Sequence, residues 1–133
     1  MKIMSINYTN TAFNVAMLLL RIGAGVLLMS HGYDKLVHFT QYRGKFMNFM
    51  GIGVTPSLSL VVFAEFICSI FIVLGLFTRL AAIPPIIAMT VALFQAHHGD
   101  VFDTGEKAAL YLTIFLSLLL LGPGKASVDG MVK

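Results

Sequence analysis

The sequence predicts an all-α integral membrane protein, a four-helix bundle with a short amphipathic segment between its first two helices. Of its 133 residues, 58% are hydrophobic and only 11% are charged, whereas soluble domains average about 45–50% and about 25%. The mean hydropathy is +0.89. The apolar residues gather in runs close to the roughly 20 residues that cross the hydrocarbon layer of a bilayer. We expect a single domain over residues 1–133, with helices at about 12–31, 57–77, 79–97 and 106–121.

The first apolar run carries an arginine, Arg21, near its middle. Asn and Thr residues before Ala12 suit the start of a helix, and the residues from Gly32 to Lys35 mark its water interface. A charged side chain at mid-bilayer is unfavourable by about 2.5–3.5 kcal/mol on insertion scales unless it is paired or faces water. Arg21 therefore needs a partner inside the bundle.

Residues 36–55 follow this helix and combine phenylalanines and methionines with Arg43 and Lys45. Such a mixture is too charged to span a membrane and is typical of an amphipathic segment on the membrane surface. We expect this segment to connect the first two helices along the interface.

The three later helices have recognisable boundaries. Pro56 suits the first turn of the second helix, which carries Glu65. Pro84 and Pro85 should kink or interrupt the third helix, as membrane helices tolerate, and the glycines around Pro123 end the fourth. The one cysteine, Cys68, excludes an internal disulfide.

This arrangement places both termini on one side of the membrane. Lysines and arginines are equally numerous on the two sides, with Lys2, Arg79, Lys125 and Lys133 on the terminal side and Lys35, Arg43, Lys45 and Lys107 on the other. The opposite side also holds the acidic residues Asp34, Asp100, Asp103 and Glu106. We therefore predict that the termini are cytoplasmic.

Glu65 is the partner that we predict for Arg21. Counted inward from interfaces near Tyr33 and Pro56, the two side chains lie at depths that agree within roughly 5 Å at the α-helical rise. An ion pair here can fix the helix register, or it can bind a polar ligand group and relay protons. Cys68 lies one turn from Glu65, and we expect it to be a buried packing residue.

A second polar group is expected at the end of the bundle away from the termini. His31 ends the first helix, His97 and His98 end the third, and Glu106 begins the fourth. Histidines near carboxylates can bind a metal or haem, or hydrogen-bond a quinone carbonyl. Interface histidines are also common as plain amphipathic residues, and we assign no metal ligand.

Motifs of several other functional classes are absent from the sequence. It contains no dinucleotide-binding fingerprint, phosphate-binding loop, zinc-protease motif or nucleophile elbow. The basic residues are too scattered for nucleic-acid recognition.

Four stretches of the chain resemble one known family. RIGAGVLLMSHGYDKL at 21–36, FAEFICSIFIVLGLFTRLAA at 63–82, GEKAALY at 105–111 and GPGKASVDG at 122–130 are similar to the DoxX family of small bacterial inner-membrane proteins. The resemblance implies a four-helix membrane protein with cytoplasmic termini. It also implies a redox association, since relatives include a subunit of a thiosulfate:quinone oxidoreductase. The matching positions are Arg21, His31, Gly32, Lys35, Glu65, Arg79, Glu106 and the 122–129 tail. Relatives that use a thiol pair differ from this chain, which has Cys68 alone.

We therefore expect a quinone-linked redox component, or a subunit of a membrane oxidoreductase complex in the bacterial inner membrane. The predicted catalytic residues are Arg21 and Glu65, and the predicted ligand-binding residues are His31, Lys35, His97 and Glu106. The expected partners are the lipid bilayer and either another protein or further copies of this chain. One alternative is a non-catalytic scaffold that holds a partner protein through residues 36–55. Another is a small transporter component that assembles as an oligomer.

Overall fold

The computed structural model describes residues 4–46, 48–96, 102 and 105–132. Within these residues all regular structure is helical, which confirms the predicted all-α class. His97, one of the predicted ligand-binding residues, lies outside the described residues.

The first helix is longer than predicted at both ends. α1 spans Asn10–Val37, and the Thr9 hydroxyl caps it by accepting a hydrogen bond from the Ala12 backbone N–H. Two short elements follow it, α2 (Phe39–Arg43) and the 3₁₀ turn η1 (Phe49–Gly51). The connection between the first two long helices is therefore itself mostly helical where it is described.

The second long helix consists of three consecutive segments. α3 (Val54–Val62) and α4 (Cys68–Leu74) flank a π-helical turn, η2 (Phe63–Ile67), and together they form one rod. The rod ends at Gly75, whose φ of 73° is the left-handed conformation that commonly terminates a helix. We call this unit the α3–α4 rod.

The remaining elements complete the bundle. α5 (Thr78–Val91) continues through Pro84 and Pro85 into η3 (Ala92–Ala96). α6 spans Glu106–Leu121, and the short α7 spans Val128–Val132. α5 is not interrupted at its two prolines, so the double proline does not end the third helix.

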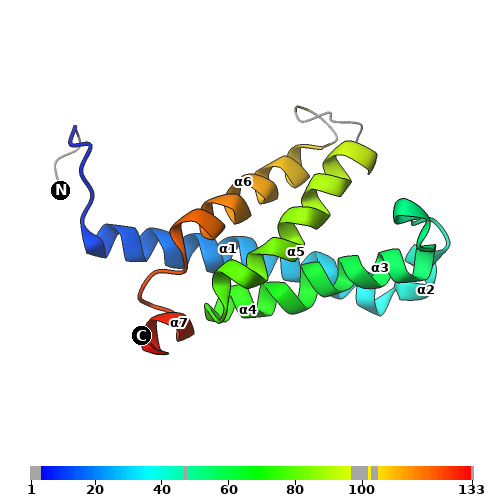
Figure 1. Ribbon diagram of the computed structural model, residues 1–133, viewed down its shortest axis with the longest axis horizontal. Helices are drawn as coiled ribbons and strands as arrows, with labels where there is room; N and C mark the ends of the chain where they lie inside the picture. Colours follow the sequence, from blue (N-terminus) through cyan, green and yellow to red (C-terminus); the bar gives the residue numbers. More distant parts are fainter. Residues whose placement is uncertain (1–3, 47, 97–101, 103–104, 133) are drawn as a thin grey trace.

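Figure 1 shows α1 running the length of the molecule, with α5 and α6 lying obliquely to it. α1 packs against η2, α4 and α6, while α5 packs against α6 and α4. The buried core between them includes Met17, Leu28, Ile72, Ala82, Phe115 and Leu118. The backbone N–H of Lys125 donates to the Asn14 side chain, so the C-terminal tail lies beside the start of α1.

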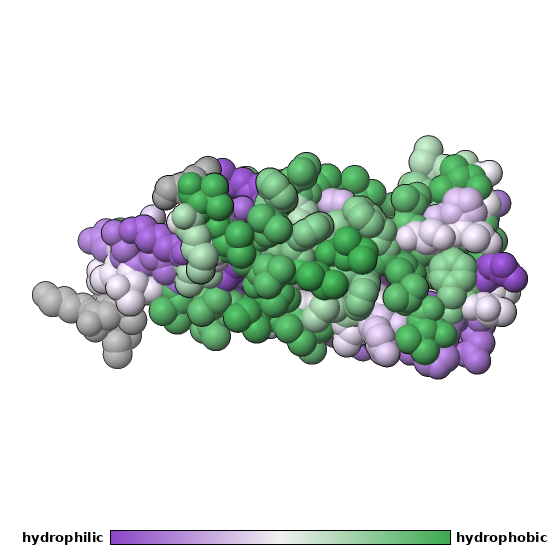
Figure 2. All heavy atoms as spheres, turned by 90° about the horizontal axis from the view of Figure 1, so that it is seen from below, coloured by the Kyte–Doolittle hydropathy of each residue, from purple (hydrophilic) through white to green (hydrophobic). Residues whose placement is uncertain are grey.

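Hydrophobic residues cover the middle of the face shown in Figure 2, whereas hydrophilic residues gather at its two ends. Among the described residues, α1 and the α3–α4 rod are long and apolar enough to cross a membrane, by length and composition. Residues Thr78–Phe94 form a shorter apolar helix. This face therefore has the banded pattern that a bilayer would match.

Candidate functional site

A cavity of about 590 Å³ lies between α5 and the first half of the α3–α4 rod. Its volume falls within the roughly 300–1,000 Å³ that is usual for small-molecule sites. Most of its wall is aliphatic or aromatic, and its polar groups come from a few side chains. The lining residues include Lys35, Lys45, Ser57 and Glu65 among the polar ones, and Phe46, Phe49, Val61, Phe63, Ile87 and Val91 among the apolar ones.

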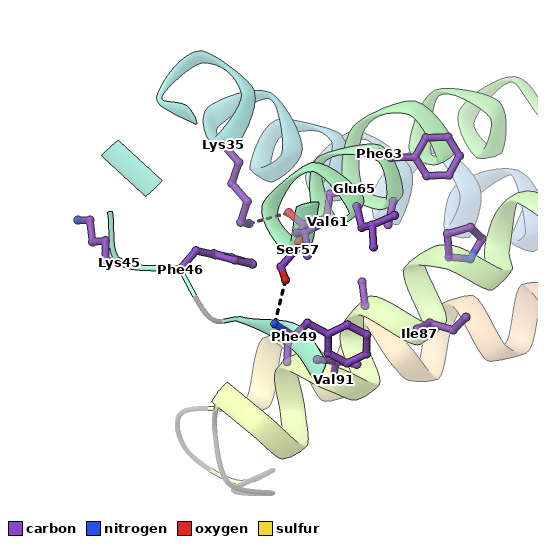
Figure 3. Close-up of a pocket in the computed structure, with 15 residues that line it drawn as sticks. Lys35, Lys45, Phe46, Phe49, Ser57, Val61, Phe63, Glu65, Ile87 and Val91 are labelled. Carbon is purple, nitrogen blue, oxygen red and sulfur yellow. Dashed lines mark hydrogen bonds and ion pairs between the residues drawn. The ribbon is translucent and has the colours of Figure 1, made fainter. Parts of the chain in front are cut away.

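An ion pair forms the charged part of this wall. The Lys35 ammonium nitrogen, Nζ, donates a hydrogen bond to Glu65 Oε1 at 2.7 Å. The exposed fractions of the two side chains are 18% and 6%, so both are largely removed from solvent. Figure 3 shows Lys35 reaching from α1 across to Glu65 on η2. The pair presents a cation and an anion to a space whose wall is otherwise mostly apolar.

Gly32 explains how α1 comes close enough to form this pair. A Cβ atom added at Gly32 would lie 2.6 Å from the Phe66 backbone nitrogen and 2.7 Å from the Glu65 carbonyl carbon. Only glycine therefore permits this approach of α1 to η2. Lys35 lies almost one turn further along α1, which places its long side chain over Glu65.

Glu65 itself lies in the π-helical turn η2. Such single-turn insertions within an α-helix are rare and are frequent at functional sites. Helical segments continue on both sides of this turn, so Glu65 is held on a rigid element rather than on a loop.

The segment after α1 closes another side of the cavity. The Ser57 hydroxyl donates to the Gly53 carbonyl at 2.6 Å and accepts from the Phe49 backbone N–H at 2.8 Å. These bonds tie η1 to the start of α3 and hold Phe49 against the cavity (Figure 3). Residues 36–55, expected to form an interfacial segment, thus also supply part of the cavity wall.

The predicted Arg21–Glu65 ion pair is wrong, because Glu65 pairs with Lys35 and Arg21 lies elsewhere. Arg21 packs against Gly75, ten residues beyond Glu65, which is about 15 Å along the rod. The prediction placed Tyr33 opposite Pro56. Instead Gly32, the residue before Tyr33, lies against Glu65 and Phe66, nine and ten residues after Pro56, so the register differs by more than two helical turns.

Arg21 belongs to the terminal end of the bundle. Its side chain is 1% exposed, and its Nη2 donates to the Ala126 carbonyl at 2.5 Å. Its Nε and Nη1 make no hydrogen bond within the described structure. Asp129 lies near enough to interact electrostatically with the guanidinium. The arginine therefore contacts the C-terminal tail and not the cavity.

The other predicted ligand-binding residues divide between the cavity and its surroundings. Lys35 lines the cavity, as described above. The His31 ring instead contacts the Tyr111 ring edge-on, with 6.1 Å between their centroids. Glu106 is exposed at the first position of α6. Neither His31 nor Glu106 is among the residues that line the cavity.

A polar cluster that the sequence did not single out lies at the end of α1. His38 Nδ1 is 3.1 Å from Asp34 Oδ1, and the Tyr42 hydroxyl donates to Asp34 Oδ2. This hydrogen bond is the largest of the effects that raise the pKa of Tyr42, so its phenol stays protonated. The spacing of Asp34, His38 and Tyr42, four residues apart, was the signal that could have revealed the cluster.

The cavity wall also contains residues that sequence reasoning did not identify, namely Lys45, Phe46, Phe49 and Ser57. For Lys45, Phe46 and Phe49 the signal was the aromatic and basic pattern of the 36–55 segment, whereas Ser57 lies beyond that segment and gave no such signal. Within the described residues, no group of three or more His, Cys, Asp or Glu side chains is arranged to hold a metal ion.

Comparison with known proteins identifies a family and a relative. The DoxX family model matches residues 16–98 of the chain. An uncharacterized protein of Haemophilus influenzae (strain ATCC 51907 / DSM 11121 / KW20 / Rd) is 32% identical over 117 residues, which is 83% of this chain and 85% of that protein. No solved structure matches the chain. The family match includes Lys35 and Glu65, together with the glycine that brings their helices together.

Proposed function

Because the chain belongs to the DoxX family of membrane proteins, we propose that it binds a quinone in the cavity and acts as a quinone-linked component of a membrane oxidoreductase. The observation that carries this proposal is an apolar cavity of about 590 Å³ with a largely buried Lys35–Glu65 ion pair in its wall. Ionisable groups inside membrane segments usually mark ligand or proton pathways.

The proposal includes a membrane arrangement. α1, the α3–α4 rod, α5 with η3, and α6 each cross the bilayer, and both terminal segments face the cytoplasm. Support comes from the apolar middle of the surface in Figure 2 and from the tail that lies beside the start of α1. In this arrangement the cavity lies toward the non-terminal side, where the chain between α1 and α3 also meets the interface.

The residues of the cavity fit a quinone head group. A quinone is a flat, lipid-soluble ring whose polar atoms are carbonyl oxygens, and aromatic side chains at Phe46 and Phe49 suit the ring. The Lys35 ammonium has three N–H donors and gives one to Glu65, so another is available for a carbonyl oxygen. Glu65 is placed to exchange a proton near that oxygen.

When bound, a quinone supplies two-electron redox chemistry that takes up or releases two protons. This chain contributes the binding site, the hydrogen-bond donor at Lys35 and the proton-exchanging carboxyl at Glu65. Cys68 is buried within α4 and forms no disulfide. A single thiol cannot form the intramolecular disulfide through which two electrons would pass to or from a quinone. A partner protein therefore supplies the electrons in the proposed complex.

Binding of quinone analogues to the purified protein tests this proposal. Short-tailed ubiquinone and menaquinone analogues are titrated into delipidated protein in mild detergent, and Lys35→Met and Glu65→Gln are compared with wild type. Loss of a hydrogen bond to a charged group costs about 1.5–3 kcal/mol, which is about tenfold or more in affinity. The control is Lys107→Met, an exposed lysine at the start of α6.

Two results would contradict the proposal. One is equal affinity in wild type, Lys35→Met and Glu65→Gln. The other is displacement of the analogue by an anionic phospholipid but not by an uncharged quinone, because Lys35 and Lys45 together can bind an anionic head group.

The scaffold alternative makes a different prediction. It requires a stoichiometric partner that is lost when Arg43 and Lys45 are altered, with no dependence on Glu65. A pull-down from mild detergent with these two sets of variants separates the scaffold from the quinone site.

A further inference from the structure

A second, polar hollow of about 230 Å³ lies next to the cavity. Its walls are Asp34, His38, Gln41, Tyr42 and Lys45. Lys45 lines both the hollow and the cavity, so the two spaces are neighbours. The hollow lies where α1 passes into α2.

One hydrogen-bonded group lies in the hollow, and the ion pair lies next to it in the cavity. His38 contacts Asp34 at 3.1 Å, and Tyr42 donates to the other oxygen of the same carboxylate. The Lys35 Nζ lies 6.0 Å from the centroid of the Tyr42 ring and 2.7 Å from Glu65 Oε1. The His38 and Asp34 side chains are 47% and 51% exposed, whereas those of Lys35 and Glu65 are 18% and 6% exposed.

The exposed His38–Asp34 pair contributes little to the stability of the protein. An exposed ion pair four residues apart on a helix contributes only about 0.3–0.5 kcal/mol. The residue types, however, suit proton exchange. Imidazole exchanges protons near neutral pH, and a carboxylate bonded to both an imidazole and a phenol can pass a proton between them.

We propose that Asp34, His38 and Tyr42 take protons from interfacial water and pass them to the Lys35–Glu65 pair through water where the hollow and the cavity adjoin at Lys45. This inference rests on the proposed quinone function and extends it from binding to proton supply. The three residues do not line the cavity, so they act through Lys35 and Glu65 as positioning and relay residues. Lys45 lines the same hollow as His38 and Asp34, Lys35 lies beside the Tyr42 ring, and Glu65 pairs with Lys35.

The chemical balance explains why a proton route is needed. Conversion of a quinone into a quinol forms two O–H bonds and consumes two electrons and two protons. Two reduced viologen radicals supply the two electrons and no proton. With this reductant both protons come from water, and in the proposed route they pass through His38, Asp34 and Tyr42.

The experiment measures quinol formation by stopped-flow absorbance in detergent-solubilised protein loaded with a short-tailed ubiquinone analogue. Reduced methyl viologen is the electron donor, and rates are recorded from pH 5 to pH 9. His38→Ala and Tyr42→Phe are compared with wild type. Gln41→Ala is the matched control, because it alters the same hollow without removing a titratable group.

We expect quinol formation to slow by about tenfold or more in His38→Ala and Tyr42→Phe, with analogue affinity within about twofold of wild type. The His38→Ala rate should recover when imidazole is added, which a purely structural role would not produce. Tyr42→Phe keeps the ring near Lys35 and removes only the hydroxyl, so it remains informative even if His38→Ala folds poorly.

Wild-type rates in both variants, with intact analogue binding, would overturn the proton route and leave the quinone site standing. Slow rates in His38→Ala without imidazole recovery, together with an equal loss in Gln41→Ala, would also overturn it. If wild-type protein binds no analogue, the proposed function and this inference both fail.

Discussion

Lys35 and Glu65 face each other across the contact between α1 and η2, with 2.7 Å between Nζ and Oε1. The contact exists because Gly32 lets the two backbones approach, and it places both charges in the wall of an apolar cavity. A buried pair of this kind is weak evidence for stability by itself. Its position beside a ligand-sized cavity is the stronger reason to connect it with function.

Removing one partner of this pair should destabilise the protein more than removing both. Lys35→Met leaves the Glu65 carboxylate buried without its cation, which costs about 3–5 kcal/mol for a buried pair. In Lys35→Met/Glu65→Met neither charge remains, so much of that loss should be recovered. The chain has no tryptophan, so the unfolding midpoint is followed by circular dichroism at a fixed heating rate. A double variant whose loss of stability equals the sum of the losses in the two single variants would contradict the pairing.

Gly32→Ala should weaken the contact between α1 and η2. The added Cβ would meet the backbone of Phe66 and Glu65 at 2.6 and 2.7 Å, and overpacking of this kind costs about 1–3 kcal/mol. The matched control is Gly23→Ala on the same helix, where a Cβ has no neighbour within 4 Å. There the gain in helix propensity should leave stability unchanged or raised by up to about 1 kcal/mol. Equal melting curves for the two variants would show that α1 does not approach η2 at Gly32.

The fold was largely predictable because long apolar runs, proline and glycine leave strong local signals. The all-α class followed from these runs. These runs do not show which charged residues of neighbouring helices lie side by side, because that depends on the register between the helices. The sequence does not show that the end of α1 at Gly32 lies against Glu65 and Phe66 and not against Pro56, and this register places Lys35, rather than Arg21, beside Glu65. Counting residues inward from two expected interfaces does not show which turns of the two helices face each other.

The candidate site was predictable only in part for a similar reason. Glu65 was singled out because a carboxylate inside an apolar run needs an explanation, and Lys35 because of the family resemblance. Phe49 and Ser57 lie in or next to the 36–55 connection, where composition suggested only surface contact. Their role depends on the hydrogen bond between them, which folds η1 back against α3. Such a contact between a loop and a helix leaves no periodic pattern in the sequence.

Asp129→Ala should loosen the C-terminal tail from the bundle. The Asp129 carboxylate accepts hydrogen bonds from the backbone N–H groups of Phe77 and Thr78 at 2.8 and 2.9 Å, which satisfies the start of α5. Loss of a capping side chain lowers the free energy of unfolding by about 0.5–2 kcal/mol. Asp129→Asn should lower it less than Asp129→Ala, because one acceptor oxygen remains. Thermal unfolding followed by circular dichroism compares the two variants with wild type. A wild-type midpoint in Asp129→Ala would contradict a capping role.

The proposed quinone in the cavity can be measured as the quinone that remains with protein purified from native membranes. Solvent extraction and absorbance, with native mass spectrometry, give the amount per chain in wild type and in Val91→Trp, which places an indole in the cavity wall. Leu120→Trp is the control, because that side chain is 76% exposed on α6. We expect about one quinone per chain in wild type and Leu120→Trp, and about a tenth or less in Val91→Trp, since overpacking by about 1–3 kcal/mol would expel the ligand. No quinone in wild type, or equal amounts in all three proteins, would contradict it.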